Sequence, residues 1–244
     1  MIVMTDLLMI VPSRGRPHNV AALLDAWAET TTGDTELWIV LDEDDPALAE
    51  SRAVRSTKDW GSLLPPKFVV GPRRRLAGTL NEVSAEAVST GRYEAIGFIG
   101  DDHHPRTRGW DERFTATLRE LGSGFVYGND LLQGERLPTG AAMTTDIIAT
   151  LGYMAPPGLV HLYLDNCWLA LGRRLDRIRY LPDVVLEHMH FLNKKAPDDD
   201  LYREVNSLER NRDDKLAFER WLAGGFEADV QRLLRAIPGA GARP

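Results

Sequence analysis

The sequence predicts an α/β protein: a mostly parallel central sheet flanked by helices, followed by a helical C-terminal extension. Short apolar runs alternate with segments of helical periodicity through the first half of the chain, which is typical of parallel strands joined by crossover helices. The apolar runs end in the polar segments PSRGRP, DEDDP, GPRRR and GDDHHPR. Since ligands bind beyond the carboxyl ends of the strands in open sheets of this kind, these segments predict the ligand crevice.

The first half is expected to alternate strand and helix. A first strand at Leu7–Val11 ends at Pro12, and Pro17 can open the helix that follows, because proline suits the first helical position. The apolar positions of that helix recur on one face. Further strands are expected at residues 36–41, 67–70 and 94–99, with helices at residues 76–87 and 110–121.

The second half is less regular. Its expected elements are strands at residues 124–130 and 184–190 and helices at residues 144–154 and 164–175. From Pro197 on, the chain is highly charged with a helical pattern, and Phe218, Trp221 and Leu222 are its expected anchors. We therefore predict a core domain of residues 1–196, with a nucleotide-binding half 1–128 and an acceptor half 129–196, and an extension of residues 197–244.

Composition excludes several classes of protein. A formal net charge of −7 and a pI near 5.4 argue against a nucleic-acid partner, which clustered Lys and Arg would bind. The one dense basic patch, Arg73 to Arg75, suits a small anion such as a diphosphate. A single cysteine, Cys167, excludes an internal disulfide and favours a cytoplasmic setting. The start of the chain lacks a basic leader, and no apolar stretch approaches the roughly 20 residues that span a bilayer.

A cluster of carboxylates and imidazoles follows the strand at residues 94–99, in the sequence GFIGDDHHPRTRGW. Asp101 and Asp102, followed by His103 and His104, would lie in the ligand crevice. Oxygen-rich sites of one or two carboxylates, completed by phosphate oxygens and water, suit Mg²⁺ or Mn²⁺. The alternative is a solvated turn, since Asp, His and Pro all favour turns.

A second pair of histidines supports a metal site. In VVLEHMH, His188 and His190 would share one strand face, because side chains alternate along a strand. One of them could complete the shell of a metal ion if this strand lies beside the strand at residues 94–99. The alternative is that each histidine satisfies a hydrogen bond at the edge of the core.

The order of these motifs resembles the GT-A glycosyltransferases, especially the family 2 type that uses nucleotide-diphosphate sugars, over residues 7–190. MIVPSRGRP is similar to their first strand and loop, and WIVLDEDDP to their second strand, whose terminal acid recognises the base. RRRLAGTLNEVSAEA resembles the segment that contacts nucleotide and phosphates, and GFIGDDHHP the strand carrying the DXD motif. One departure is that Gly100 stands where the first Asp of that motif normally lies.

The resemblance implies a role for each matching residue. The residues expected at the nucleotide sugar are Pro12, Ser13, Arg14, Asp42, Arg75, Asn81 and Asp101. The expected metal ligands are Asp102, His188 and His190, with His103 and His104 as possible ligands. In LYLDNCWLALGRR, the resemblance makes Asp165 the catalytic base, while its position at a helix start also allows an N-cap.

The resemblance further implies a metal-dependent, inverting transfer of a sugar from a nucleotide-diphosphate donor to an acceptor hydroxyl, with Mn²⁺ or Mg²⁺ as cofactor. The acceptor, the donor sugar and nucleotide and the oligomeric state are not predicted. A retaining transfer stays an alternative, since some related GT-A enzymes with a metal-binding histidine retain configuration. Two alternative functions stay open. One is a non-catalytic carbohydrate or nucleotide-sugar-binding protein, and the other is a metallohydrolase built from the histidines, although no H-E-x-x-H signature is present.

Overall fold

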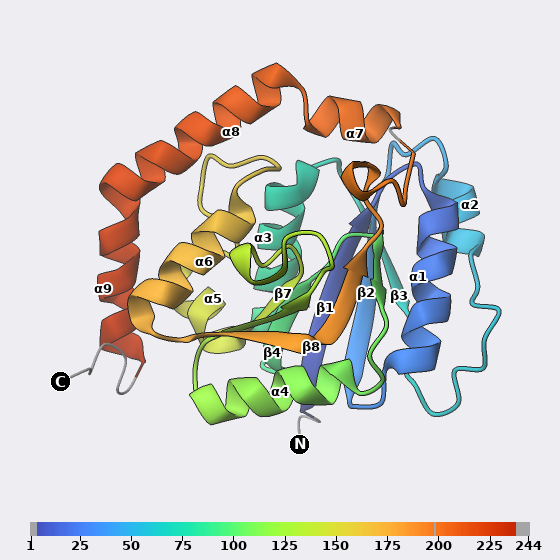
Figure 1. Ribbon diagram of the computed structural model, residues 1–244, viewed down its shortest axis with the longest axis horizontal. Helices are drawn as coiled ribbons and strands as arrows, with labels where there is room; N and C mark the ends of the chain where they lie inside the picture. The colour runs from blue at the N-terminus through green and yellow to red at the C-terminus, as the bar shows by residue number, and fades with distance from the viewer. Residues whose placement is uncertain (1–3, 198, 238–244) are drawn as a thin grey trace.

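The computed structural model describes residues 4–197 and 199–237 and confirms the predicted α/β architecture (Figure 1). An eight-stranded sheet has the order β3-β2-β1-β4-β7-β6-β8-β5. The strands are β1 (Thr5–Ser13), β2 (Thr35–Asp42), β3 (Lys67–Gly71), β4 (Tyr93–Phe98), β5 (His103–Pro105), β6 (Phe125–Asn129), β7 (Ala141–Thr144) and β8 (Ile178–His188). Neighbouring strands are parallel except where β7 pairs with β4 and β6 and where β5 pairs with β8.

The helices follow the predicted order. They are α1 (Pro17–Thr30), α2 (Leu48–Ala53), α3 (Arg75–Thr90), α4 (Trp110–Leu121), α5 (Thr145–Leu151), α6 (Leu164–Leu175), α7 (Asp200–Val205), α8 (Leu208–Arg220) and α9 (Phe226–Ala236). Proline opens α1 as predicted. Helix α2 was not predicted, because six residues are too few to establish a period. In the described part of the chain, no helix combines the length and the apolar character needed to cross a bilayer.

The sheet is buried on both faces. Along β1, Leu7 and Met9 belong to one apolar cluster and Leu8 and Ile10 to another, as the alternation of side chains along a strand requires. The first cluster includes the inner faces of α1 and α4. The second includes those of α3, α5, α6 and α9. Because helices cover both faces of the sheet, the ends of the strands stay open, and the polar segments lie at their carboxyl ends.

Two strands differ from the expectation. Residues 141–144 form β7, so the helix predicted from residue 144 begins at Thr145. Strand β8 begins earlier than predicted and ends at His188, and it pairs with β5 and β6 rather than with β4. Pairing places His188 directly opposite His103. The prediction that His188 and His190 share a strand face is wrong, because His190 caps the short 3-10 helix Phe191–Asn193 after the strand has ended.

The helices after residue 199 wrap around the rest of the molecule rather than extending from it (Figure 1). Trp221 is buried and Phe218 packs against the core, as predicted, but Leu222 is 41% exposed and is not an anchor. Asp214 of α8 is buried and accepts hydrogen bonds from the backbone N–H groups of residues 160, 161 and 162. The domain boundary at residue 196 stays a prediction. Helix α8, beyond that boundary, holds the loop that precedes α6 through Asp214.

Candidate metal and nucleotide site

A cavity of about 440 Å³ lies at the carboxyl ends of β1, β2 and β4. One wall comes from these strand ends, where Ser13, Asp42 and Asp101 lie. Another part of its lining comes from the start of α6 and from α7, where Asp165 and Tyr202 lie. The cavity therefore joins segments from the predicted nucleotide half, the predicted acceptor half and the C-terminal extension.

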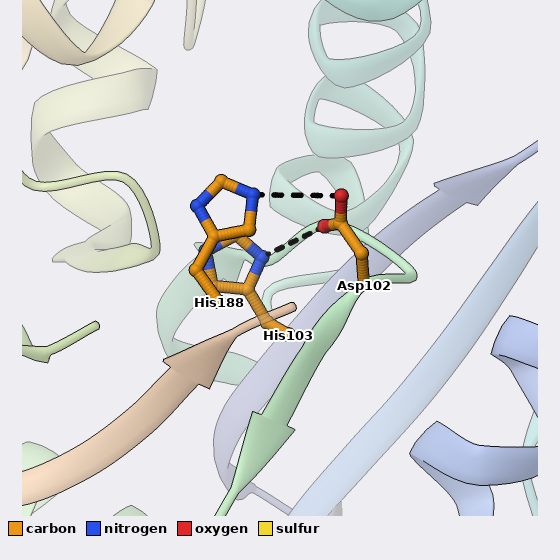
Figure 2. Close-up of side chains that lie close together, drawn as sticks. All are labelled: Asp102, His103 and His188. Carbon is orange, nitrogen blue, oxygen red and sulfur yellow. Dashed lines mark hydrogen bonds and ion pairs between the residues drawn. The ribbon is translucent and has the colours of Figure 1, made fainter. Parts of the chain in front are cut away.

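Asp102, His103 and His188 form a compact cluster in this cavity (Figure 2). Asp102 Oδ1 lies 3.2 Å from His103 Nδ1, and Asp102 Oδ2 lies 3.4 Å from His188 Nε2. The two imidazole rings stack with their centroids 4.0 Å apart. Each residue directs one ligand atom inward, and these atoms all lie within 4.8 Å of one another. The arrangement follows from the pairing of β5 with β8.

The glycine that departs from the DXD pattern has a steric reason. A Cβ atom on Gly100 would lie 2.4 Å from Asp102 Oδ1, closer than a Cβ contact can be. An acid at position 100 is therefore incompatible with the observed orientation of the Asp102 carboxylate. His103 and His188, rather than an acid at position 100, lie beside the Asp102 carboxylate.

The donor set fits a divalent metal ion. Burial, together with the neighbouring His188, lowers the pKa of His103, which favours the neutral imidazole that binds metals. Burial would raise the pKa of Asp102, but hydrogen bonds from His103 and His188 hold it well below its usual value, so the carboxylate is ionised. His188 Nδ1 is buried without a hydrogen-bond partner, and Asp130 Oδ2 lies 3.9 Å from it. A carboxylate behind a metal-binding histidine is a usual outer partner.

The other two histidines predicted as ligands, His190 and His104, do not belong to the group of three ligand atoms. His190 Nδ1 accepts a hydrogen bond from the backbone N–H of Leu192, and burial together with His188 lowers the pKa of His190 to about 4. The ring of His190 still contacts His188, with centroids 4.8 Å apart. His104 Nδ1 lies 3.4 Å from a guanidinium nitrogen of Arg106 and does not line the cavity. The structure thus groups His103, and neither His190 nor His104, with Asp102 and His188.

Asp101 has a different set of partners from Asp102. Its carboxylate accepts hydrogen bonds from the Ser13 hydroxyl at 2.6 Å and from the Asn19 amide at 3.1 Å. Arg16 Nη1 lies 3.5 Å from Asp101 Oδ1. Burial and the adjacent Asp102 raise the pKa of Asp101 to about 6 despite these contacts. Asp101 is therefore bound to β1 and α1 rather than to the histidines.

Arginines and acids surround the part of the cavity between β1, β2 and α3. Arg14 Nη1 donates to Asp42 Oδ2 at 3.0 Å, and Arg73 Nε lies 3.6 Å from the same oxygen. Arg75 forms an ion pair with Glu204 of α7. Arg75 has a left-handed backbone, with φ of 61°, which is strained for a residue other than glycine and is often found at functional sites.

Two of the residues expected at the nucleotide differ in their placement. Pro12 lines the cavity beside Ser13. Asn81 does not line it: its Oδ1 accepts from the backbone N–H groups of Met154 and Ala155, and its Nδ2 donates to the Ala155 carbonyl. These three hydrogen bonds join α3 to the loop after α5, so in this structure the Asn81 side chain holds that loop.

Asp165 lies on the helical wall of the cavity. It is the second residue of α6, and Tyr163, with φ of 68°, occupies the N-cap, so Asp165 is not the N-cap of this helix. Its Oδ1 accepts from the N–H of Asn166 at 2.9 Å. Burial raises the pKa of Asp165 to about 6. A half-buried carboxylate with this pKa can accept a proton near neutral pH.

Among the residues that sequence reasoning missed are Arg16 and Tyr202, which line the cavity, and Asp199 and Glu204, which pair with its arginines. Arg16 is 6% exposed and stacks on the Tyr202 ring, with its guanidinium carbon 4.2 Å from the ring centroid. The Tyr202 hydroxyl donates to Asp102 Oδ2 at 2.5 Å. The sequence offered one signal, the second arginine of PSRGRP. Nothing in the charged segment after residue 197 indicates which of its side chains turn inward.

Several solved structures are similar to this chain in fold. The mannosyltransferase PcManGT from Pyrobaculum calidifontis, in complex with GDP-Man and Mn²⁺, matches 99% of this chain and 78% of its own, at 16% identity and a TM-score of 0.55. S. aureus TarS 1-349 in complex with UDP matches 96% of this chain and 81% of its own, at 15% identity and a TM-score of 0.53. No protein-family model and no curated protein matches the sequence.

The chain therefore has a GT-A-like nucleotide-sugar transferase fold, as the sequence predicted. At these identities the likeness establishes the fold alone. In two further TarS structures, the chain spans 59% of TarS 1-349 and 43% of a longer TarS, so it covers about half the length of these proteins.

Proposed function

We propose that this protein is a metal-dependent glycosyltransferase that moves a sugar from a nucleotide-diphosphate donor to an acceptor hydroxyl. One observation carries the proposal: a single cavity in a GT-A-like fold holds the cluster of Asp102, His103 and His188 on one wall and Asp165 on another. The donors bound by similar structures support it, namely GDP-Man with Mn²⁺ in PcManGT and UDP or UDP-GlcNAc in TarS.

Asp102, His103 and His188 would hold the metal ion, and we propose Mn²⁺ over Mg²⁺. Mg²⁺ prefers an all-oxygen octahedral shell, whereas two imidazoles and one carboxylate suit a transition metal. The ion, when bound, supplies positive charge for the leaving diphosphate. Arg16 and Arg73 lie in the same cavity and add positive charge from the protein itself.

Asp165 is proposed as the general base of an inverting transfer. Asp165 lines the same cavity as the cluster of Asp102, His103 and His188. We propose that it takes the proton from an acceptor hydroxyl that approaches the sugar from the face away from the diphosphate. With a pKa of about 6, Asp165 is ionised at pH 7 and still basic enough to take the proton of the hydroxyl. Asp42, held by Arg14, is proposed to contact the base of the nucleotide.

The proposed domains assign the donor to residues 1–128 and the acceptor to residues 129–196. Ser13 and Asp101, from the proposed donor half, and Asp165, from the proposed acceptor half, line the same cavity. The buried single cysteine, Cys167, is in keeping with the proposed cytoplasmic setting.

The test uses the complete chain with a panel of UDP-, GDP-, CDP- and dTDP-sugars. We expect one donor class to raise the melting temperature only when Mn²⁺ is present, since a ligand that binds the native state stabilises it. The same donor should be hydrolysed slowly, with release of the nucleoside diphosphate. Binding without any hydrolysis or transfer would instead support the non-catalytic binding protein, which the glycine at position 100 favours. No binding by any donor would contradict the proposal.

A metallohydrolase is a second candidate, because two imidazoles and one carboxylate with room for water also fit catalytic zinc. Zinc retained through purification, with ester or amide hydrolysis in the absence of any nucleotide, would favour it. Mn²⁺-dependent stabilisation by a nucleotide sugar would count against it.

A further inference from the structure

Helix α7 directs three side chains at groups that a metal-bound nucleotide would use. These side chains are Asp199, which caps the helix, Tyr202 and Glu204. We propose that α7 is an internal competitor of the donor: in the ligand-free protein it occupies the metal-binding carboxylate and the arginines, and a nucleoside diphosphate with its metal ion displaces it. This inference rests on the proposed function and concerns regulation of the same site.

Tyr202 occupies the carboxylate at the centre of the metal cluster. Its hydroxyl donates to Asp102 Oδ2, the oxygen that faces His188 Nε2. A hydrogen bond to a carboxylate uses the lone-pair region that a cation would use. A metal ion between Asp102 and His188 must therefore move the phenol aside or share that oxygen with it.

Asp199 occupies the buried arginine of the cavity. Its two oxygens accept hydrogen bonds from Arg16 Nε and Nη2, both at 2.7 Å, in the fork geometry that guanidinium groups also adopt with phosphate. Arg16 also stacks on Tyr202, so the two contacts hold the helix as a unit. A phosphate that approaches Arg16 competes with this carboxylate for the same N–H groups.

Glu204 occupies the arginines at the start of α3. Arg73 Nη2 lies 3.0 Å from both oxygens of Glu204, and Arg75 is paired with the same carboxylate. The two like charges are close because both guanidinium groups pair with one carboxylate. Burial and the nearby Arg73 lower the pKa of Arg75. Removing Glu204 would leave the two guanidinium groups facing the cavity without this counter-charge.

In this proposal, α7 can move out of the cavity without unfolding of the rest of the protein. Tyr202 is the one buried residue of α7, so little apolar area holds the helix in place. The following helix stays anchored, because buried Asp214 accepts hydrogen bonds from three backbone N–H groups of the loop before α6. Displacement can therefore be confined to residues 199–206.

The first experiment titrates Mn²⁺ alone into the complete chain. We expect Tyr202→Phe to lower the Kd for Mn²⁺ about threefold to tenfold, since a hydrogen bond to a charged group no longer opposes the ion. Asp200→Asn is the matched control, because Asp200 lies on the same helix with a fully exposed side chain paired to Arg203. An unchanged or higher Kd for Tyr202→Phe would overturn the inference, since the phenol would then be neutral or would support the metal.

The second experiment follows hydrogen exchange of residues 199–206 with Mn²⁺ plus UDP and with Mn²⁺ plus GDP. We expect faster exchange with the nucleotide that binds, and a nucleotide Kd about tenfold lower in the double variant Asp199→Asn with Glu204→Gln. Slower or unchanged exchange would mean that α7 stays on the bound nucleotide, and competition would be wrong.

The two proposals fail in different ways. If neither nucleotide binds the native chain or the double variant, and no sugar nucleotide of the wider panel binds either, the proposed transferase function is contradicted, and the inference falls with it. If a nucleotide binds the native chain and the double variant equally tightly, the transferase proposal stands and the internal competitor does not.

Discussion

The two walls of the cavity differ in the surroundings of Asp102 and Asp165. Asp102, at the strand ends, is buried between two imidazoles and a phenol, and hydrogen bonds from the imidazoles keep its pKa low. Asp165, near the start of α6, accepts hydrogen bonds from two backbone N–H groups, its own and that of Asn166, and burial raises its pKa to about 6. In the proposed function, Asp102 therefore belongs to the wall that would hold the cation and Asp165 to the wall that would hold the proton.

The largest effect is expected from the proton-holding wall. Asp165→Asn keeps the shape of the side chain but cannot accept a proton, so turnover should fall about 10³-fold while donor affinity is kept. Steady-state kinetics with whichever donor the panel of sugar nucleotides identifies, together with titration of that donor, separate the two quantities. A variant with full turnover would remove Asp165 as the base.

The cation-holding wall should respond in affinity instead. Asp102→Ala removes the central ligand and should weaken Mn²⁺ binding about 100-fold, with loss of metal-dependent donor binding. Calorimetric titration of Mn²⁺ measures the change. Asp183→Ala is the control, because Asp183 is an exposed carboxylate paired with Arg113 outside the cavity. Equal Mn²⁺ affinity in native and Asp102→Ala proteins would place the metal elsewhere.

The pH dependence of turnover tests the helical wall without a substitution. Asp165 acts as a base only when ionised, so kcat at saturating metal and donor should fall about tenfold per pH unit below its pKa of about 6. It should level off above pH 7. A flat kcat between pH 5 and 7 would separate the rate from Asp165.

Gly100 tests how tightly the cation wall is packed. A methyl group at this position meets Asp102 Oδ1, so Gly100→Ala should turn the carboxylate and weaken Mn²⁺ binding about threefold to tenfold. Gly224→Ala is the matched control, because nothing lies within 4 Å of a Cβ there. Unchanged Mn²⁺ affinity in Gly100→Ala would mean that the carboxylate orientation does not govern the metal.

The smallest expected effect is on stability. Because folding raises the pKa of Asp165, its contribution to stability is present below pH 4 and is lost as the pH rises through about 6. At pH 8 the buried charge is a cost, so Asp165→Asn should stabilise the fold by about 1 kcal/mol, discounted for partial exposure. At pH 4 the difference should vanish. Denaturant unfolding at both pH values gives the comparison, and equal stability at pH 8 would contradict it.

The sequence was informative where the physics is local and repetitive. Alternating apolar runs with polar ends predicted β1, β2, β3 and β4 and placed Asp102 at the edge of the sheet. For the pair His188 and His190, only His188 was placed on the strand correctly. Side chains alternate with period two only within a strand, and β8 ends at His188. Asn81 matched a motif, yet its side chain holds a loop, a contact between segments that no local pattern indicates.

The C-terminal contribution could not be predicted for a further reason. Tyr202 reaches Asp102 across 100 residues of sequence, and Asp199 reaches Arg16 across 183. Such contacts depend on the path of the chain between β8 and α7, which brings α7 to the cavity. Composition shows a charged helical segment, but only the packed structure determines which charges face the cavity.

The three hydrogen bonds that Asp214 accepts from residues 160–162 have a consequence for engineering. The loop they hold leads directly into the helix that carries Asp165, so the wall that would face the acceptor is assembled partly by α8. Exchange of the acceptor half between related enzymes would therefore succeed only when α8 travels with it. A graft that stops at residue 196 would include Asp165, the proposed base, but would lack Asp214, whose carboxylate holds the loop before α6.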